Sequence, residues 1–299
     1  MKNRNAFIPI LMAGFTLCIG MACFPQTVNA SYQASYPLPK LSGNCCDDLI
    51  SVAESQLGYT ESSTGETIYA DWAGQPGRPW CSEFISWCAN KAKIPTSIIP
   101  VGTSSNAYRD FFSKQGNYYV ISGNDNTSCG CRKKASKTIS VSEIRKGDIL
   151  LVETSGGFSN GPDHASLVVS VDNGIITTID GNTNNQVRYR TRTATFIHGV
   201  CRPMYQLTGI SLRAKKTAGK NIKLKWNKLS NVKGYQIYRS TSKKSGYRLL
   251  KTIKKKNNMY KNTRIISGTR YYYKIRAFQV RHGKKIYGSF SNIVSCKIK

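Results

Sequence analysis

The sequence has no acidic residue after Asp180, although the chain is 299 residues long and contains 15 Asp plus Glu. The 92 residues from 208 to 299 carry 26 Lys plus Arg with no opposite charge, whereas residues 31–207 carry 16 basic and 15 acidic residues. A chain of this length commonly forms two domains. The charge distribution therefore predicts a near-neutral domain followed by a strongly cationic one.

The sequence also has no second long apolar run after its first thirty residues. Lys2 and Arg4 precede an uncharged apolar run from 6 to 24, and the segment closes with small residues at Ala30. This order is typical of a secretory signal peptide, and the competing reading is a membrane anchor. Two prolines and the cleavage-like end favour removal, so we expect an exported, secreted protein without stable membrane insertion.

Apolar residues at helical spacing occur in the stretch RPWCSEFISWCANKA, residues 78–92. Their positions follow the i, i+3, i+4, i+7 pattern that predicts an amphipathic helix facing a core. Cys81 falls in the first turn, where free backbone N–H groups and the helix dipole favour an anion, so a thiol there ionises more readily. Cys81 is thus a candidate nucleophile, and Cys88 is expected to be a packing residue.

Histidine is scarce, and only three are available as a base for a cysteine nucleophile: His164, His198 and His282. His282 lies in a cationic turn, and His198 has no carboxylate near it in the sequence. His164 begins a pair of apolar runs that flank Asp172-Asn173-Gly174, which indicates a β-hairpin. The sequence therefore favours His164 as the base.

The register of this hairpin decides what His164 faces. A three-residue loop, with Gly174 in the left-handed conformation, places His164 opposite Asn182 and Ser166 opposite Asp180. A two-residue Asn-Gly turn shifts the register by one and sends these side chains to the other face. The prediction therefore depends on the turn type.

Motifs in this order resemble the CHAP family of cysteine, histidine-dependent amidohydrolases and peptidases, relatives of the NlpC/P60 papain-like enzymes. The resemblance is carried by PWCSEFISWCA, KGDILL, DHASLVVSVDNGIITTIDGNT and RTRTATFIHGVCRP, within residues 44–203. It implies a papain-like fold with Cys81 as nucleophile, His164 as base, and Asp180 with Asn182 orienting the imidazole. It further implies cleavage of peptidoglycan, either as a muramoyl-alanine amidase or as a peptide endopeptidase.

Two features depart from the family pattern. Asp180 stands where relatives often have Glu, which shortens the reach and is expected to give Asn182 part of the orienting role. Before the helix, YADWAGQPGRPW offers only Asp71 in place of an Asp-rich calcium loop. We therefore predict no metal and no cofactor. The oxyanion is expected to be held by the Cys81 backbone N–H and by a second donor, with Gln75 as a candidate.

The remaining cysteines suggest a disulfide in an oxidising exterior. The two close pairs, Cys45 with Cys46 and Cys129 with Cys131, are candidates to bridge one another. A zinc site is the alternative, but no CxxC spacing or nearby histidine supports it. Cys201 and Cys296 are a weaker candidate pair.

Residues 210–299 read as short alternating strands. Ile222, Leu224 and Trp226 alternate with lysines, and Tyr271 begins a second such run. The order of these motifs resembles a fibronectin type III domain, in which Trp226 is the core tryptophan and Tyr271 the tyrosine of a turn between strands. Tyr235, Tyr238 and Tyr287 are candidates to stack on sugars or bases, although tyrosines in a sandwich are more often core.

The sequence as a whole thus predicts an α+β chain with an all-β C-terminal sandwich. The expected parts are a signal peptide at 1–30, a linker at 31–43, a catalytic domain at 44–203, a short linker at 204–209 and a basic domain at 210–299. The expected function is a secreted, cell-wall associated peptidoglycan hydrolase whose basic domain binds an anionic wall polymer such as teichoic acid rather than intracellular nucleic acid. The alternatives are an inactive wall-binding protein and an extracellular adhesin for polyanions or glycans.

Overall fold

The computed structural model describes residues 32–124, 130–154, 161–281 and 283–298. The expected signal peptide lies outside these ranges, as do Cys129 and His282. Among the helices in these ranges, none has the length and apolar character needed to cross a membrane.

Residues 45–201 build a seven-stranded sheet with helices packed on it. The helices are α1 (Cys45–Glu54), α2 (Ile68–Trp72), α3 (Cys81–Lys91), α4 (Ser105–Lys114) and α5 (Cys131–Lys134), with short 3-10 turns at Val141–Glu143, Ala194–Phe196 and Tyr205–Leu207. The strands are β1 (Tyr118–Ile121), β2 (Lys137–Ile139), β3 (Ile149–Val152), β4 (His164–Asp172), β5 (Ile175–Thr183), β6 (Gln186–Arg192) and β7 (Ile197–Cys201).

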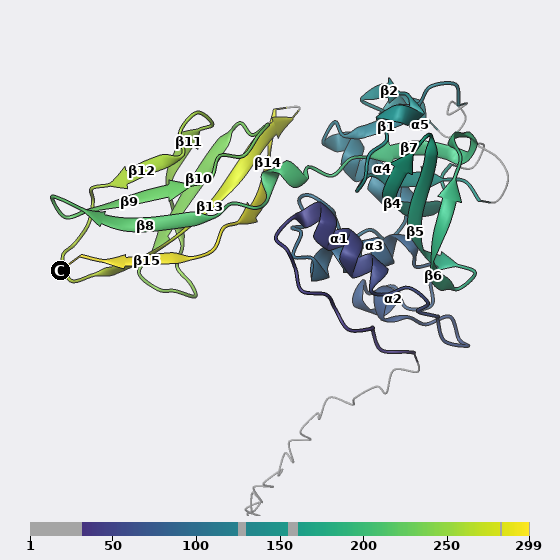
Figure 1. The fold of residues 1–299 in the computed structure, drawn as a ribbon, viewed down its shortest axis with the longest axis horizontal. Coiled ribbons are helices and arrows are strands. Elements are labelled where there is room, and N and C mark those ends of the chain that lie inside the picture. Colours follow the sequence, from purple (N-terminus) through teal and green to yellow (C-terminus); the bar gives the residue numbers. More distant parts are fainter. Residues whose placement is uncertain (1–31, 125–129, 155–160, 282, 299) are drawn as a thin grey trace, which may run out of the picture. The chain divides into compact units, whose positions relative to one another are not determined.

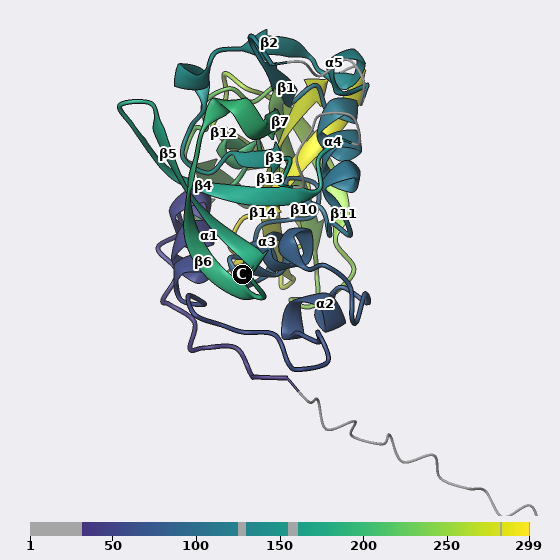
Figure 2. The same ribbon diagram turned by 90° about the vertical axis from the view of Figure 1, so that its right-hand side faces the viewer.

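The sheet has the order β2-β1-β7-β3-β4-β5-β6. The β1–β2 pair is parallel and the other pairs are antiparallel. Helix α3 packs against β4 and β5, and α1 and α2 pack against α3 (Figures 1 and 2). The sheet thus brings the start of β4 and the end of β5 next to the helix that begins at Cys81.

Helix α3 is buried on all sides rather than on one. From Cys81 to Ala89 every residue is buried, including Ser82, Glu83 and Ser86, which the helical pattern placed on an exposed face. The amphipathic prediction was therefore wrong for this helix, because α1 and α2 cover the side that the sheet leaves open. The predicted start of the helix at Cys81 is confirmed.

Gly181 permits the close contact between β5 and α3. A Cβ added at Gly181 would lie 2.6 Å from Cβ of Phe84 and 2.9 Å from Cζ3 of Trp80. Both rings belong to a buried aromatic cluster in which Tyr69 stacks on Trp80 with centroids 5.3 Å apart. Any side chain at this position would therefore push the strand away from the helix.

The β4–β5 hairpin reaches the expected register by a different route. Asp172 pairs with Ile175, and Asn173 and Gly174 have positive φ values of 49° and 81°, so the turn has two residues rather than three. Such a turn matches the twist of the strands. A bulge between Val168 and Ser170 then shifts the register back by one. As a result, the side chains of His164 and Ser166, near the start of β4, form hydrogen bonds with Asp180.

Residues 32–43, expected as a linker, run along the first helices. The backbone N–H of Tyr36 donates to Oε1 of Gln56 at 3.1 Å, and the hydroxyl of Tyr59 donates to the carbonyl oxygen of Gln33 at 2.8 Å. This segment is therefore hydrogen-bonded to the rest of the fold.

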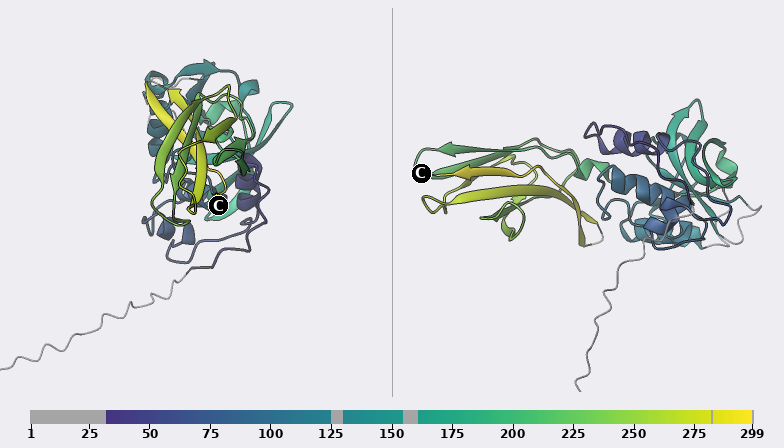
Figure 3. Two further views of the ribbon diagram at one scale, coloured as in Figure 1. Left: turned by 90° about the vertical axis from the view of Figure 1, so that its left-hand side faces the viewer. Right: turned by 90° about the horizontal axis from the view of Figure 1, so that it is seen from below.

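Residues 212–297 form two antiparallel sheets. Their strands are β8 (Leu212–Thr217), β9 (Asn221–Trp226), β10 (Gly234–Ser240), β11 (Arg248–Lys254), β12 (Met259–Asn262), β13 (Arg270–Arg281), β14 (Lys284–Phe290) and β15 (Val294–Lys297). One sheet has the order β12-β9-β8, and the other has the order β11-β10-β13-β14, with β15 also paired to β13. The two sheets face each other across a shared apolar core (Figure 3).

The predicted alternation of this sandwich is confirmed. Ile222, Leu224 and Trp226 are buried at 0%, 0% and 2% exposure, while the lysines between them are exposed. The hydroxyl of Tyr271 accepts a hydrogen bond from the backbone N–H of Ile266 at 3.2 Å, which ties the turn before β13 to that strand. The sequence pattern predicts strand-like segments near residues 221, 234, 248, 271 and 291, and it therefore omits strands β8, β12 and β14.

We predict that Gly181→Ala destabilises the fold by about 1–3 kcal/mol, because the added methyl group overlaps Phe84 and Trp80. Thermal and denaturant unfolding measure the change. Thr183→Ala, two residues further along the same strand, is the matched control and should change the free energy of unfolding by less than about 0.5 kcal/mol. Equal effects of the two substitutions would contradict the importance of the close contact.

Candidate functional site

Cys81 is the first residue of α3 and is 5% exposed. The helix begins here because the backbone N–H of Phe84 donates to the carbonyl oxygen of Trp80, and no side chain caps the end. The first backbone N–H groups of α3 therefore have no hydrogen-bond partner within the helix, and they lie at the N-terminal end that carries Cys81. The indole of Trp80 donates to Oε2 of Glu61 at 2.7 Å and is fixed by that contact.

His164 is the first residue of β4 and faces Cys81. Its Nε2 lies 3.0 Å from Oδ2 of Asp180, and the Cys81 thiol is near enough to help raise the pKa of the imidazole. Because Nε2 is directed to the carboxylate, Nδ1 is the ring nitrogen left for the sulfur. The structure thus brings together three residues that are far apart in the sequence.

The charges around the imidazole favour its protonated form. Burial acts to lower the pKa of His164, but the hydrogen bonds and charges of Asp180 and Cys81 outweigh burial and raise that pKa from 6.5 to about 10. A thiolate beside an imidazolium is the state in which a cysteine is a strong nucleophile and the histidine can release a proton. The pair is therefore arranged for nucleophilic chemistry.

Asp180 is fully buried and its Oδ2 is the centre of the polar contacts. It accepts from Oγ of Ser166 at 2.9 Å, and Nη2 of Arg192 also donates to it. Burial acts to raise the pKa of Asp180, but the hydrogen bond from His164 and the charges of His164 and Arg192 hold that pKa below its ordinary value. Asp180 therefore stays ionised and orients the imidazole directly.

Arg192 was missed by the sequence reasoning. It lies in β6 and pairs in register with Ile176 rather than with Asp180, so it reaches the carboxylate diagonally. Its side chain is 12% exposed. The run RYRTR of alternating arginines beside the strand that holds Asp180 was the available signal, but the β5–β6 register places Arg188 opposite Asp180, so only the side-chain contact identifies Arg192.

Asn182 does not share the orienting role that was expected of it. It lies in the irregular end of β5, with a φ of 59°, where the pairing with β6 shifts between Asp180 and Thr183. No hydrogen bond joins its side chain to His164, and both residues are in the described part of the chain. The shorter Asp180 reaches the imidazole without help because the bulge in β4 brings the two strands into the right register.

The second oxyanion donor is still a prediction. Gln75 lies in the loop before α3 and is half-buried, and its backbone N–H donates to the carbonyl oxygen of Ala70 at 2.8 Å. This bond fixes the backbone, whereas the side-chain amide is engaged in no hydrogen bond with the described residues.

Glu83 is a second ionisable group in the first turn of α3 that the sequence reasoning passed over. It is 1% exposed, and neither carboxylate oxygen has a hydrogen-bond partner within the described ranges. Burial raises the pKa of Glu83 to about 7. An acid between two apolar positions of the helix was the signal that could have identified it.

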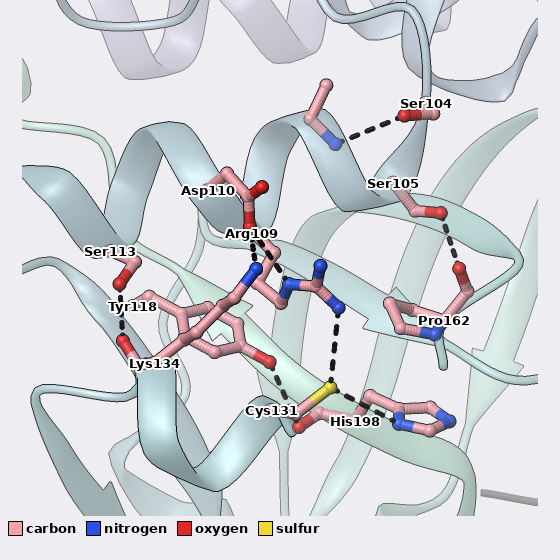
Figure 4. A network of polar contacts seen from close by, with 11 residues as sticks. Ser104, Ser105, Arg109, Asp110, Ser113, Tyr118, Cys131, Lys134, Pro162 and His198 are labelled. Carbon is pink, nitrogen blue, oxygen red and sulfur yellow. Dashed lines mark hydrogen bonds and ion pairs between the residues drawn. The ribbon is translucent and has the colours of Figure 1, made fainter. Parts of the chain in front are cut away.

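His198 has a carboxylate neighbour that the sequence did not reveal. Its Nε2 lies 3.6 Å from Oε2 of Glu153, and burial, the largest influence, lowers the pKa of His198. On its other side, Nδ1 lies 3.9 Å from Sγ of Cys131, which also accepts from Arg109 (Figure 4). Cys131 is disulfide-bonded, so the His198 cluster contains no free thiol for the imidazole to activate.

The proposed bridge between the two close cysteine pairs is not formed. Cys45 and Cys46 are free thiols in the first turn of α1, where Sγ of Cys46 contacts the carbonyl oxygen of Lys146 at 3.7 Å. Burial raises the pKa of Cys46 to about 11. Cys131 is disulfide-bonded, and Cys129 lies outside the described residues.

The remaining cysteines in the described ranges are also free. Cys201 and Cys296, the weaker candidate pair, are buried thiols in β7 and β15. Burial raises the pKa of Cys88 well above its ordinary value, in keeping with the packing role expected of that residue. Within the described ranges no group of three or more His, Cys, Asp or Glu side chains is placed to hold a metal ion.

Comparisons with known proteins do not assign the chain to a family. No family model and no curated protein matches it. An Fn3-like protein from Clostridium thermocellum is 24% identical over 30% of this chain and 88% of its own, with a TM-score of 0.25. A fibronectin type III domain of human collagen XX is 18% identical over 29% of this chain and 86% of its own, with a TM-score of 0.23.

A longer match is to a β-1,2-glucanase from Parabacteroides distasonis. It is 16% identical over 54% of this chain, but this chain covers only 26% of the glucanase, and the TM-score is 0.26. The solved structures similar to this chain thus include fibronectin type III-like domains, and none of the three carries an argument about activity. The resemblance to the CHAP family receives no support from these matches and stays a prediction.

We predict that His164 stays protonated well above neutral pH and loses its proton near pH 10. Because the pKa is raised in the folded state, the stability that this group contributes is complete below about pH 6.5 and is lost as the pH rises toward 10. Asp180→Asn removes one of the charges that raises this pKa, so the titration midpoint should fall by about one pH unit or more. NMR titration of the ring resonances measures it.

The control for this titration is Asp172→Asn. It removes an exposed carboxylate from the end of β4 opposite to His164. It should leave the midpoint unchanged within about 0.2 pH units. A midpoint near pH 6.5 in the unaltered protein would show that the imidazole lacks its charged partners.

Proposed function

We propose that the chain is an exported cysteine hydrolase that cleaves amide bonds of peptidoglycan, with a papain-like CHAP domain in residues 44–203. The observation that carries the proposal is the buried His164, which is hydrogen-bonded to Asp180 and has its pKa raised by both Asp180 and the Cys81 thiol at the start of a helix. A lone buried cysteine or histidine is usually structural, but a buried imidazole held between a thiol and an ionised carboxylate is the arrangement of a cysteine nucleophile and its base.

The reaction would proceed in two stages. The Cys81 thiolate attacks the amide carbonyl carbon and forms a carbon–sulfur bond, and His164 gives its Nδ1 proton to the leaving nitrogen as the carbon–nitrogen bond breaks. A water molecule then loses a proton to His164 and attacks the thioester, which releases the carboxylic acid and the thiolate. Asp180 holds the ring in place through both stages and stabilises its protonated form.

The developing oxyanion would be stabilised by the first turn of α3. The backbone N–H of Cys81 is one of the helix groups without an intrahelical partner, and it lies beside the attacking sulfur. Gln75 remains the candidate for a second donor. One such donor is typically worth a factor of about 100–1,000 in rate.

The C-terminal sheets favour attachment to an anionic polymer. Residues 208–299 carry 26 Lys plus Arg and no acid. Such a surface attracts polyanions over roughly 8 Å at physiological salt. For an exported protein acting on a cell wall, the corresponding partner is an anionic wall polymer such as teichoic acid. A non-catalytic wall-binding protein is the second candidate function, and the same cationic segment favours it.

We predict that Cys81→Ala abolishes the release of new amino groups from purified peptidoglycan, with a loss of at least about 1,000-fold. The matched control is Cys88→Ala, which removes the second thiol of the same helix and should retain activity in the folded protein. Mass spectrometry of the released fragments identifies the new terminus and therefore the bond. Equal release by the Cys81→Ala variant and the unaltered protein would refute the cysteine mechanism, and no release by either would favour the non-catalytic candidate.

Binding of the full-length Cys81→Ala variant to purified walls should weaken steeply between about 50 and 200 mM salt, because each contact between a cation and the polymer releases a counterion. Sedimentation of the bound fraction with the walls measures this. Walls from which the anionic polymer has been extracted should bind at least about 10-fold less protein. Salt-independent binding that survives the extraction would rule out an electrostatic attachment.

A further inference from the structure

The outer face of the sheet β11-β10-β13-β14 combines cations with aromatic rings. Along β13, Tyr271, Tyr273 and Ile275 point into the core, so the alternate residues point outward. Arg276 pairs with Gln236 of β10 and with Phe290 of β14, and Lys274 pairs with Tyr238. We call this surface the β13 platform, and its members are Tyr238, Tyr272, Lys274, Arg276, Tyr287 and Phe290.

Arg276 is held in a fixed position on this platform. Its Nε and Nη2 donate to Oε1 of Gln236 at 3.1 and 3.0 Å, and Nη2 also donates to the hydroxyl of Tyr238 at 2.8 Å. The guanidinium carbon lies 3.8 Å from the ring centroid of Tyr287 and 5.1 Å from that of Phe290. Little side-chain entropy is therefore lost when this guanidinium binds an anion.

Lys274 is placed against rings in the same way. Its Nζ lies 4.1 Å from the ring centroid of Phe290 and 4.4 Å from that of Tyr247. Phe290 is 39% exposed, so part of its ring is open to solvent although two cations lie against it. The platform thus offers partly exposed rings next to positive charges at fixed positions.

These cations have no negative partner within their own sheets. All the ion pairs formed in the described part of the chain involve residues between Asp47 and Arg202. Since residues 208–299 contain no Asp or Glu, an anion for Arg276 or Lys274 must come from outside this segment. Charge complementarity therefore favours an anionic ligand.

The outer face of the other sheet provides a contrast. There Lys223 and Lys225 of β9 lie between Arg213 and Lys215 of β8 and Lys261 of β12. Among the cation–ring contacts of the described residues, none involves these side chains. Both faces are cationic, but only the β13 platform has rings on which a ligand can stack.

We propose that the β13 platform is a binding site for an anionic polysaccharide, with sugar rings against the aromatic side chains and phosphate or carboxylate groups on Arg276 and Lys274. This inference rests on the proposed wall attachment and gives it a location. A diffuse cationic surface needs no aromatic rings, and an uncharged glycan needs no fixed guanidinium, so the combination favours a ligand with both sugars and negative charges.

The test compares two charge-matched variants in the full-length Cys81→Ala protein. Lys274→Gln with Arg276→Gln removes two charges from the platform, and Lys223→Gln with Lys225→Gln removes two from the opposite face. Affinity is measured by calorimetry for a glycosylated poly(glycerol phosphate). We expect a loss of about 10-fold or more for the platform variant and less than about 3-fold for the control.

Phe290→Leu is a further variant that keeps the charge and, because the ring is partly exposed, should keep the fold. Its affinity is measured for the glycosylated polymer, for the same polymer without sugars, and for a single-stranded oligodeoxynucleotide of equal charge. The unaltered platform should prefer the sugar-bearing polymer by about 3-fold or more, and Phe290→Leu should remove that preference. Unfolding temperatures of all variants establish that each is folded.

Three outcomes separate the hypotheses. Equal losses in the two charge variants, with no effect of Phe290→Leu, would leave wall attachment intact and overturn the platform. Tighter binding of the oligodeoxynucleotide than of the sugar-bearing polymer would overturn the choice of ligand. No binding of the unaltered protein to any anionic polymer would contradict both the platform and the proposed attachment. The proposed hydrolase activity is tested separately, by the Cys81→Ala variant.

Discussion

The candidate site depends on the close contact between α3 and β5 at Gly181. The helix carries Cys81, the strand carries Asp180, and His164 of β4 must reach both. A Cβ at Gly181 would lie 2.6 Å from Phe84, so the distance between the helix and the strand is set by the missing side chain. Hydrogen bonding over about 3 Å tolerates little displacement, and the polar contacts of the site therefore depend on packing around an apolar ring.

Burial strengthens the electrostatic interactions of this site and makes an unpaired charge there costly. Asp180 is wholly buried and its Oδ2 is shared by His164, Ser166 and Arg192. A buried carboxylate is costly unless it is paired, and here two cationic groups and a hydroxyl offset that cost. The arrangement keeps the carboxylate ionised and the imidazole protonated. The neighbouring Glu83 lacks such partners, and its raised pKa is the result of the same burial.

Charge is segregated along the chain, so that the candidate site and the cationic surface lie in different segments. The buried ionisable groups of the candidate site belong to the part in which acids and bases nearly balance. The C-terminal sheets carry only positive charge, and their cations lie against aromatic rings on one face and beside one another on the other. Repulsion among the cations lowers the stability of the sandwich, which makes an external anion a natural stabilising partner.

The sequence by itself determined the start of α3 and the alternation of Trp226 and its neighbours, because these depend on local spacing. It did not determine that α3 is covered on every side, that Val169 forms a bulge, or that Cys45 and Cys46 are free, since each depends on segments distant in the chain. The turn at Asn173-Gly174 alone would have sent His164 away from Asp180. Only the bulge in the assembled sheet decided the register, and only the folded side chains brought Arg192 rather than Arg188 to Asp180, because such contacts are long-range and no local pattern records them.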